Sequence, residues 1–396
     1  MTCRAKWLSA LILCVSLGAC GESHASPPEF IALTQDGDSV RVETVRGPVV
    51  TLLYETPRLG AGDYQLSVNP AGTHAIVRRD EADSGGNPIP ADVTLIDLDT
   101  GEAQVLDVAS RALDVSRDGF GRLTEYPWRW RPDRLGIFVR FLGDFNPDVV
   151  LLSLDGDEDR NLLPDCELTD LHPTRPLVMG DCRRVRSGPE QAFVNTETGE
   201  REVIYGLEYS ERLQRFVRDL GTLSIQRNDG LYPEILRVRD ASGAVVIERE
   251  LNGWMAGAPS PRGDAVPLFD EGRQEIAIWD AETDEIRGVQ SCEEPMDIES
   301  PYAWSPDGRS YGALSCSSEA VVMNLEAGTL TLEQGAGPDG AEIAFERTGG
   351  RLLHGTVQGD ARVYALYDGR TGAPLGDPRP AGLDPTARLV WRYRAP

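Results

Sequence analysis

Short apolar segments separated by polar turns repeat along most of the chain. The clearest example is "YAWSPDGRSYGALS", residues 302–315, in which two apolar segments flank Ser305, Pro306, Asp307 and Gly308. Proline at the second position and glycine at the fourth are typical of a type I turn. This stretch therefore predicts a β-hairpin.

The hairpin recurs along the chain. Its other copies are "LSVNPAGTHAIV" (66–77), "WRWRPDRLGIFV" (128–139), "LTDLHPTRPLVM" (168–179), "GAPSPRGDAVPL" (257–268), "IAFERTGGRLLH" (343–354), "AGLDPTARLVWR" (381–392) and a weak "RDLGTLSIQ" (218–226). A second kind of turn, such as "IDLDTGEAQVL", lies between successive copies. Its markers are Gly47, Gly101, Gly156, Gly199, Gly243, Asp284, Gly328 and Gly372, spaced by 41 to 55 residues. A four-strand unit of about 44 residues is typical of propeller blades.

The count of these units predicts an all-β fold, a single β-propeller of eight four-stranded blades over residues 30–396. Seven blades is the alternative, because the copy at 218–226 is weak. The chain begins with an unpartnered second hairpin, "RVETVRGPVVTLL", and stops after a first hairpin, "DPTARLVWRY". We expect the two to form one composite blade that closes the ring and leaves no free sheet edge. "FIALTQ" (30–35) has no assigned place in this scheme, and an additional strand in the closing blade is the alternative for it.

The N-terminus has the layout of a secretory signal peptide. Arg4 and Lys6 precede an apolar run at residues 7–17 that is too short to span a bilayer. The run ends in "LGAC", which resembles the lipobox of bacterial lipoproteins. That resemblance implies removal of residues 1–19, lipidation of Cys20 and a tether over residues 20–29. Gly21 resembles the residue after the cysteine in lipoproteins sent to the outer membrane, so we expect an exported lipoprotein there, facing the periplasm or the cell surface. Ordinary cleavage that leaves Cys20 as a free thiol is the alternative.

Charge narrows the range of partners. The net charge is −25, and removal of residues 1–19 would leave −27. Such a surface repels phosphates and anionic headgroups, which argues against nucleic acid and against any membrane contact other than the lipid anchor. Lys6 is the only lysine, so lysine Schiff-base and P-loop chemistry are excluded from the mature chain. We expect a monomer without a cofactor.

Four cysteines remain in the mature domain, and their positions predict two disulfides. Cys166 and Cys182 lie eight residues on either side of residue 174, so an antiparallel hairpin turning there places them opposite one another. Cys292 and Cys316 bracket the turn at Ser305. In an oxidising compartment both pairs should form, each within one blade and on the face opposite the hairpin turns. Four buried free thiols is the alternative.

Catalytic and metal-binding motifs are scarce. The four histidines (His24, His74, His172 and His354) have no ligand spacing, and no "GxSxG" motif occurs. The alternating acids of "LDGDEDRN" suggest calcium. However, Arg160 stands where an EF-hand-type loop needs glycine, which favours a solvated turn. We therefore predict no metal site.

The "SPDG" hairpins followed by "DxxTG" turns resemble the WD-repeat-like, TolB-like propellers of secreted bacterial proteins. The resemblance implies a binding platform, with ligands at the variable loops rather than at the uniform hairpin turns. Trp128, Trp130, Phe145 and Trp254 are the candidate binding residues. We expect the partner to be an envelope protein or a glycan. An envelope enzyme, a hydrolase or lyase acting on sugars or lactones at the channel mouth, is the alternative.

Overall fold

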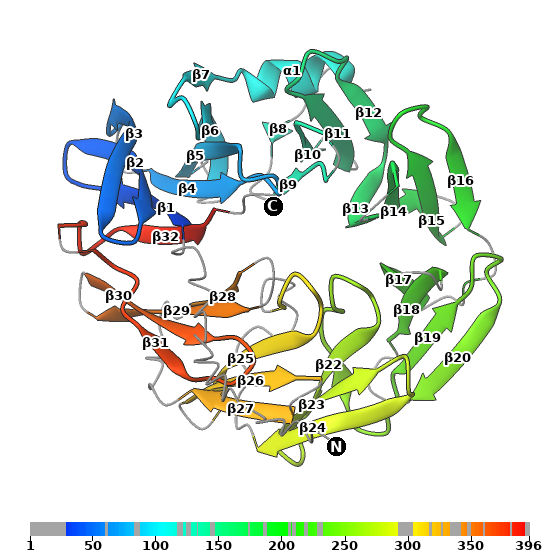
Figure 1. Ribbon diagram of the computed structural model, residues 1–396. Helices are drawn as coiled ribbons and strands as arrows, with labels where there is room; N and C mark the ends of the chain where they lie inside the picture. Colours follow the sequence, from blue (N-terminus) through cyan, green and yellow to red (C-terminus); the bar gives the residue numbers. More distant parts are fainter. Residues whose placement is uncertain are drawn as a thin grey trace, which may run out of the picture.

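The computed structural model is a ring of antiparallel sheets around a central axis (Figure 1). It describes residues 29–59, 62–82, 88–116, 122–123, 128–132, 134–142, 147–172, 175–184, 188–204, 207, 211–217, 221–227, 233–291, 304–316, 319–325, 328–332, 342–346, 350–358, 361–380 and 382–392. Among these residues no helix is long and apolar enough to cross a membrane. The single β-propeller predicted from the sequence is confirmed.

Eight sheets follow one another around the ring, and we number them from the one that contains β1. Sheet 1 holds β1 (Glu29–Gln35), β2 (Ser39–Arg46), β3 (Val49–Pro57) and β32 (Arg388–Trp391), and sheet 2 holds β4 (Asp63–Val68), β5 (His74–Ala82), β6 (Pro88–Asp97) and β7 (Ala103–Val105). Sheet 3 holds β8 (Arg122–Leu123), β9 (Arg129–Trp130), β10 (Gly136–Leu142), β11 (Pro147–Ser153) and β12 (Arg160–Leu163). Sheet 4 holds β13 (Cys166–Leu171), β14 (Leu177–Arg184), β15 (Gly188–Asn195) and β16 (Arg201–Ile204).

The other half of the ring continues in the same way. Sheet 5 holds β17 (Glu211–Val217), β18 (Gly221–Gln226), β19 (Ile235–Arg239) and β20 (Val245–Glu250), and sheet 6 holds β21 (Met255–Ala256), β22 (Ala265–Asp270), β23 (Glu275–Asp280) and β24 (Glu285–Ser291). Sheet 7 holds β25 (Ser310–Cys316), β26 (Glu319–Asn324) and β27 (Gly328–Leu332), with Trp304 bridged to Tyr311 where an innermost strand would lie. Sheet 8 holds β28 (Glu342–Phe345), β29 (Arg351–Gln358), β30 (Ala361–Asp368) and β31 (Pro374–Gly376). The eight sheets match the eight repeats, and the weak copy at 218–226 contributes β18 to a four-stranded sheet.

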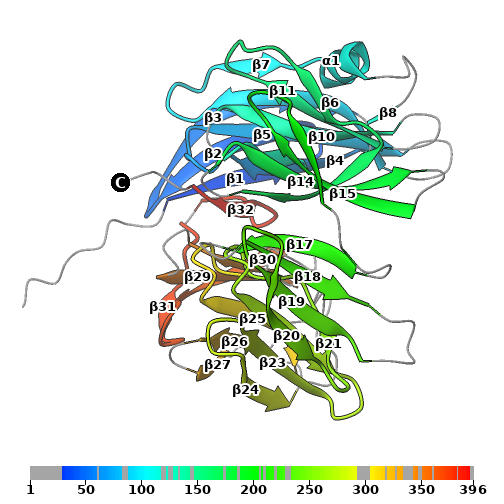
Figure 2. The same cartoon turned by 90° about the vertical axis from the view of Figure 1, so that its right-hand side faces the viewer.

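Sheet 1 joins the two ends of the chain, as predicted, but the strands are divided differently. The order β3-β2-β1-β32 places three N-terminal strands beside one C-terminal strand, whereas the sequence predicted two from each end. "FIALTQ" is most of β1, and Phe30 pairs with Trp391. The stretch "DPTA" therefore lies before the innermost strand and is not a hairpin turn within the closing sheet. β1 and β32 lie side by side in both views of the ring (Figures 1 and 2).

The two faces of the ring carry different connections. One face, here called the hairpin face, carries the turns between the first and second strands and between the third and fourth strands of each sheet. The opposite face, here called the loop face, carries the connections between second and third strands and those from one sheet to the next. Connections on the hairpin face are mostly of similar length. Those on the loop face range from the two residues between β12 and β13 to the stretch between β7 and β9, which includes helix α1 (Val108–Val115).

The marker positions have a common backbone conformation, which explains their spacing. Seven of the eight, Gly47, Gly101, Gly156, Gly199, Gly243, Asp284 and Gly372, have φ between 53° and 99°. Each lies in a turn between the third and fourth strands. Glycine reaches this left-handed region without a steric penalty, which is why it dominates these turns. Asp284 is the exception, and its carboxylate accepts a hydrogen bond from Trp279 Nε1 at 2.9 Å.

Packing between neighbouring sheets holds the ring together. Eight clusters of buried apolar side chains each span two adjacent sheets. The cluster between sheets 4 and 5 is the smallest, with Met179, Leu213 and Phe216 at its centre. Because each sheet packs mainly on its two neighbours, the boundary at sheet 1 is what converts a stack of sheets into a closed ring.

Arg392 fastens this closing boundary at the hairpin face. Its side chain is only 2% exposed and pairs with Glu29 at 2.8 Å and with Asp99 at 2.6 Å. Its Nε donates to the carbonyl of Gly72 at 2.9 Å. Glu29 begins β1, whereas Gly72 and Asp99 belong to the two hairpin turns of sheet 2. One guanidinium therefore links the C-terminal strand, the N-terminal strand and the next sheet.

Candidate functional site

Trp130 makes a contact between two sheets. Its indole Nε1 donates to Ser67 Oγ, 2.8 Å away on the innermost strand of sheet 2. Trp304 and Trp391, at the innermost positions of sheets 7 and 1, likewise donate to the carbonyls of Ala258 and Ala344 in the preceding sheets. These tryptophans are a repeated inter-sheet fastening. This hydrogen bond gives Trp130 a packing role, and its role in binding stays a prediction.

The other three candidate binding residues differ in how far they are buried and in whether the structure describes them. Trp254 is 8% exposed and belongs to the cluster between sheets 5 and 6, which leaves little of its ring for a ligand. Phe145 lies outside the described residues. Trp128 packs, half-buried, against the cluster between sheets 2 and 3.

Trp128 lies beside a buried ion pair that the sequence analysis did not identify. Arg78 and Asp80, both on β5, are 7% and 6% exposed, and Arg78 Nη2 lies 2.8 Å from Asp80 Oδ2. The Arg78 Cζ lies 5.1 Å from the centre of the Trp128 ring, a cation–π distance. We call Arg78, Asp80 and Trp128 the arginine–tryptophan cluster.

The strand register explains how two charges come to lie in this boundary. Side chains alternate along β5, so Ile76, Arg78 and Asp80 share one side of sheet 2. Ile76 belongs to the apolar cluster that faces sheet 3, whereas Ala75 and Val77 face sheet 1. The charged pair therefore continues the apolar stripe of Ile76 toward the loop face. A buried ion pair in such a place costs desolvation that apolar residues would not, so its presence needs an explanation.

The cluster has unused hydrogen-bonding capacity. Arg78 Nε, Asp80 Oδ1 and Trp128 Nε1 are buried and have no hydrogen-bond partner among the residues that the structure describes. Two of these atoms donate and one accepts. A hydroxyl group or a water molecule has the complementary set, with one donor and two acceptor lone pairs. The polarity of these three atoms matches that of one hydroxyl group, and all three are closed to solvent in this conformation.

A second buried charge cluster, on sheet 5, provides a contrast. Glu211 is fully buried, and Arg239 donates to it through Nη2 at 2.9 Å to both carboxylate oxygens. Ser224 Oγ and Arg237 Nη1 donate to it as well, at 2.5 and 3.3 Å. Because both oxygens of Glu211 are bonded within the protein, this cluster requires no ligand. We assign it a structural role.

The innermost strand of sheet 3 is interrupted next to the arginine–tryptophan cluster. β8 pairs with β10 at Phe141 and Leu142, and β9 pairs with β10 at Ile137 and Phe138. Five residues, 124–128, separate β8 from β9, whereas only two separate the corresponding positions on β10. Extra residues in one strand of a pair are over-represented next to functional sites. Trp128 is the last residue of this insertion.

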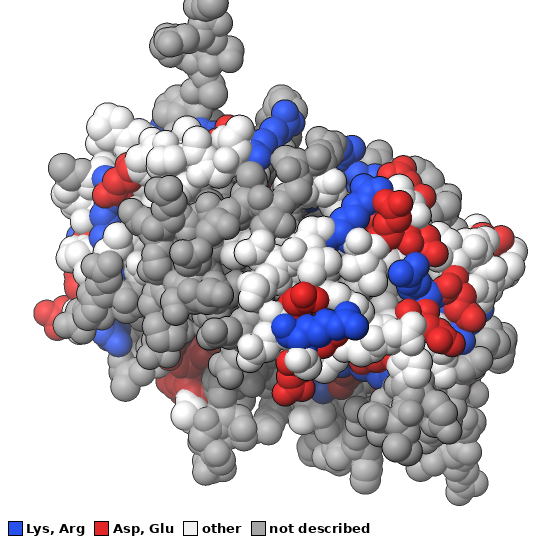
Figure 3. Space-filling view, turned by 90° about the horizontal axis from the view of Figure 1, so that it is seen from below, with Lys and Arg blue, Asp and Glu red and all other residues white. Residues whose placement is uncertain are grey.

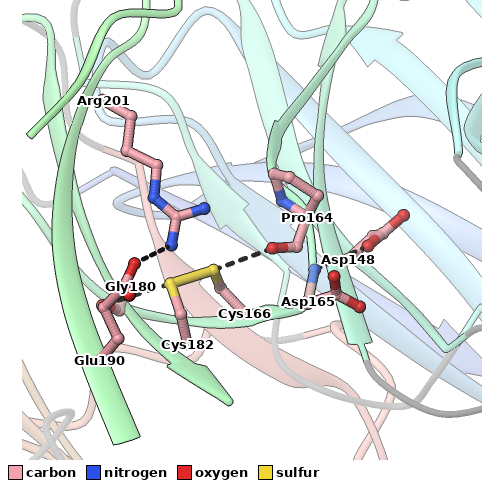
Figure 4. The surroundings of a disulfide bond; sticks show 8 residues. All are labelled: Asp148, Pro164, Asp165, Cys166, Gly180, Cys182, Glu190 and Arg201. Carbon is pink, nitrogen blue, oxygen red and sulfur yellow. Dashed lines mark hydrogen bonds and ion pairs between the residues drawn. A yellow bond between two sulfur atoms is a disulfide. The ribbon is translucent and has the colours of Figure 1, made fainter. Parts of the chain in front are cut away.

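The disulfide between Cys166 and Cys182 forms as predicted (Figure 4). The two cysteines are directly paired across β13 and β14, with their Cα atoms 4.0 Å apart. They lie at the end of this hairpin remote from its turn, beside the connection from β12 to β13. The bridge is therefore on the loop face. Cys292 lies outside the described residues, and Cys316 is the last residue of β25, so the second bridge stays a prediction.

The aspartates of "LDGDEDRN", which suggested calcium, bond to other side chains of the protein. Asp159 pairs with Arg111 and Asp157 with Arg134, while Asp155 accepts from Ser153. These acids of "LDGDEDRN" thus bond to protein groups. Within the described ranges, no group of three or more histidine, cysteine or acidic residues could hold a metal ion.

Two histidines of the mature chain lie where burial suppresses their charge. Burial lowers the pKa of His354, which is 2% exposed on β29. Burial also lowers the pKa of His172, whose Nδ1 accepts from the backbone N–H of Arg175. Both imidazoles are neutral at pH 7.

The outer surface carries its arginines next to acids. Figure 3 shows one side of the ring, on which basic and acidic residues lie next to one another. Arg287 pairs with Glu285 at 2.9 Å and Arg249 with Asp284 at 3.6 Å, for example. With 39 basic and 64 acidic residues, the excess charge is negative, as the sequence indicated.

No protein-family model and no curated protein sequence matches this chain. Among solved structures, the dihydro-heme d1 dehydrogenase NirN is similar with a TM-score of 0.52 and 16% identity, over 90% of this chain and 75% of that one. An oligogalacturonate lyase in complex with manganese has a TM-score of 0.47 and 14% identity, over 86% and 96% of the two chains. TolB from Acinetobacter baumannii has a TM-score of 0.40 and 12% identity, over 92% and 82%. The similarity to NirN supports the fold alone, and a propeller is compatible with a binding platform or with an enzyme.

Proposed function

We propose that this protein is a lipid-anchored propeller of the cell envelope that binds a protein or glycan ligand on its loop face. The observation that carries the proposal is the arginine–tryptophan cluster. It places a charged pair with unused hydrogen-bonding atoms beside a half-buried indole, toward the loop face of an otherwise apolar boundary. Aromatic rings and side chains that can bond hydroxyl groups are the usual components of glycan and protein contacts.

The lipid anchor in this proposal depends on the sequence alone. "LGAC" supports lipidation of Cys20, and Cys20→Ala should then release the protein from the membrane fraction and abolish fatty-acid labelling. Membrane retention of this variant equal to that of wild type would contradict the anchor. The binding role is independent of that result.

Trp128→Phe separates binding from folding. The substitution removes the indole N–H, which has no partner among the described residues, and keeps an aromatic ring. Removal of an unsatisfied buried donor is stabilising, whereas the smaller ring loses apolar packing and part of the cation–π contact with Arg78, so Tm should change little. A lost hydrogen bond to a ligand, about 1 kcal/mol, should weaken affinity about five-fold.

The measurement is binding of the full chain, purified in detergent, to a glycan array and to immobilised envelope proteins. Arg134→Ala is the matched control, since Arg134 is half-exposed on the hairpin face and pairs there with the surface acids Asp157 and Glu197. Equal affinity for wild type and Trp128→Phe, with Arg134→Ala weaker, would place binding on the other face. Turnover of a bound sugar or lactone would instead favour the enzyme alternative.

A further inference from the structure

We infer that the hairpin face of the propeller is turned toward the membrane and that the loop face is turned away from it. The inference rests on the lipid anchor proposed above. It follows from where the described chain begins. Glu29, the first residue of β1, pairs with Arg46, the last residue of β2, next to the turn between β2 and β3. The chain therefore enters the propeller at its hairpin face.

Arg392 holds this entry point in place. It bonds Glu29 through both the backbone and the side chain, and it binds Gly72 and Asp99 in the hairpin turns of sheet 2. The opposite end of β1 is on the loop face, because Gln35 donates to the carbonyl of Tyr64 at the start of β4. The entry point is thus fixed to one face by four hydrogen bonds.

The length of the tether decides which face can approach the bilayer. Eight residues, 21–28, separate Cys20 from Glu29. A segment of this length spans at most about 30 Å, whatever its conformation. The two faces are about 20 Å apart, since strands such as β1 span seven residues at ~3.3 Å each. A tether starting at the hairpin face would need most of its full extension to reach past the sheets, so the hairpin face stays nearer to the lipid.

Charge opposes insertion of this face into the membrane. Its turns carry Asp97, Asp99 and Asp240, and hydrogen bonds from the turn lower the pKa of two of these carboxyls. For Asp97 the largest cause is the backbone N–H of Thr100, and for Asp240 it is the side chain of Ser242. Both carboxylates stay ionised at neutral pH and repel anionic headgroups. The loop face, with the Cys166–Cys182 bridge and the arginine–tryptophan cluster, is left open to a partner in the aqueous compartment.

Energy transfer to a lipid-borne acceptor tests the orientation. A donor fluorophore is placed, through a non-canonical amino acid, at one of four exposed positions of the lipidated full chain in neutral vesicles. On the hairpin face these are Arg46 in sheet 1 and Glu282 in sheet 6, and on the loop face they are Asp38 in sheet 1 and Glu271 in sheet 6. Transfer should be higher from Arg46 than from Asp38, and higher from Glu282 than from Glu271.

Labels in both sheet 1 and sheet 6 distinguish the possible orientations of the ring on the membrane. A higher transfer from the loop-face positions, or equal transfer from Glu282 and Glu271, would overturn the inference, because the ring would then be inverted or stand on its edge. A control with 20 glycine and serine residues inserted after Pro28 should reduce the difference while the protein still floats with the vesicles. If Cys20→Ala floats as well as wild type, the anchor fails, and that result is separate from the orientation.

Discussion

Arg392→Ala tests whether one guanidinium closes the ring. The substitution removes the guanidinium that pairs with Glu29, whose side chain is 15% exposed, and that donates to the carbonyl of Gly72. Breaking a buried ion pair by removing one partner typically costs about 3–5 kcal/mol, because the other charge stays buried and uncompensated. We expect the free energy of unfolding to fall by ~3 kcal/mol or more.

Urea denaturation followed by tryptophan fluorescence measures this change. Arg134→Ala is the control, because its guanidinium is half-exposed and pairs with exposed Asp157 and Glu197. Exposed pairs contribute at most about 1 kcal/mol, so the control should unfold nearly as wild type does. Arg392→Lys should recover only part of the loss, since a lysine cannot reach three acceptors through a planar fork. A loss below ~1 kcal/mol for Arg392→Ala would refute the reasoning.

Three further predictions concern other parts of the ring. Cys182→Ser should lower the free energy of unfolding by about 3 kcal/mol by the chain-entropy model, since the bridge closes a loop with a sequence separation of 16, and hydrogen exchange should rise first on the loop face of sheet 4; unchanged exchange there would contradict this. Asp97 has a lowered pKa, so its contribution is present above the unfolded pKa of about 3.9 and is lost as the pH falls through the lower, folded value; the Tm of Asp97→Asn should therefore decline less than that of wild type between pH 6 and pH 3, and parallel declines would oppose this. Gly199→Ala should cost about 1 kcal/mol through φ alone, because its φ is +74° and no heavy atom lies within 4 Å of an added Cβ; a loss of several kcal/mol would point to a steric clash instead.

The repeat could be predicted from the sequence because each of its turns requires a particular backbone conformation. A left-handed residue is needed at one position between the third and fourth strands, and glycine at Gly101 or Gly199 marks that position. The cysteine pair followed from the same register, because Cys166 and Cys182 are equidistant from a turn. Local backbone chemistry was sufficient for both predictions.

The local sequence pattern did not predict how many strands of the closing sheet come from each end of the chain. "DPTARLVWRY" has the composition of a hairpin, yet only β32 pairs with β1, and Arg392 takes its acceptors from residues 29, 72 and 99. Those contacts are set by ring closure. Nothing in residues 381–396 alone distinguishes a hairpin from a single innermost strand.

The candidate site depended on contacts between sheets in the same way. Trp130 was a binding candidate on its position after a long loop, but its N–H bonds to Ser67 across the boundary. The signal for the arginine–tryptophan cluster was present in "HAIVRRDEA", where Arg78 and Asp80 continue the alternation of Ile76 on one side of a strand. Alternation alone does not say which side of a sheet is buried, and in a propeller both sides are.

The most direct test of the account is the hydrogen-exchange footprint of a ligand identified on the array. If the ligand binds on the loop face, the amide protons of the protein should be protected from exchange at the ends of β5 and β10 nearest the arginine–tryptophan cluster, residues 78–82 and 139–142. The account predicts no change in the hairpin-face turns at residues 98–102 and 196–200. Protection confined to those turns would contradict the account, because the bound partner would then lie on the face that the tether turns toward the membrane.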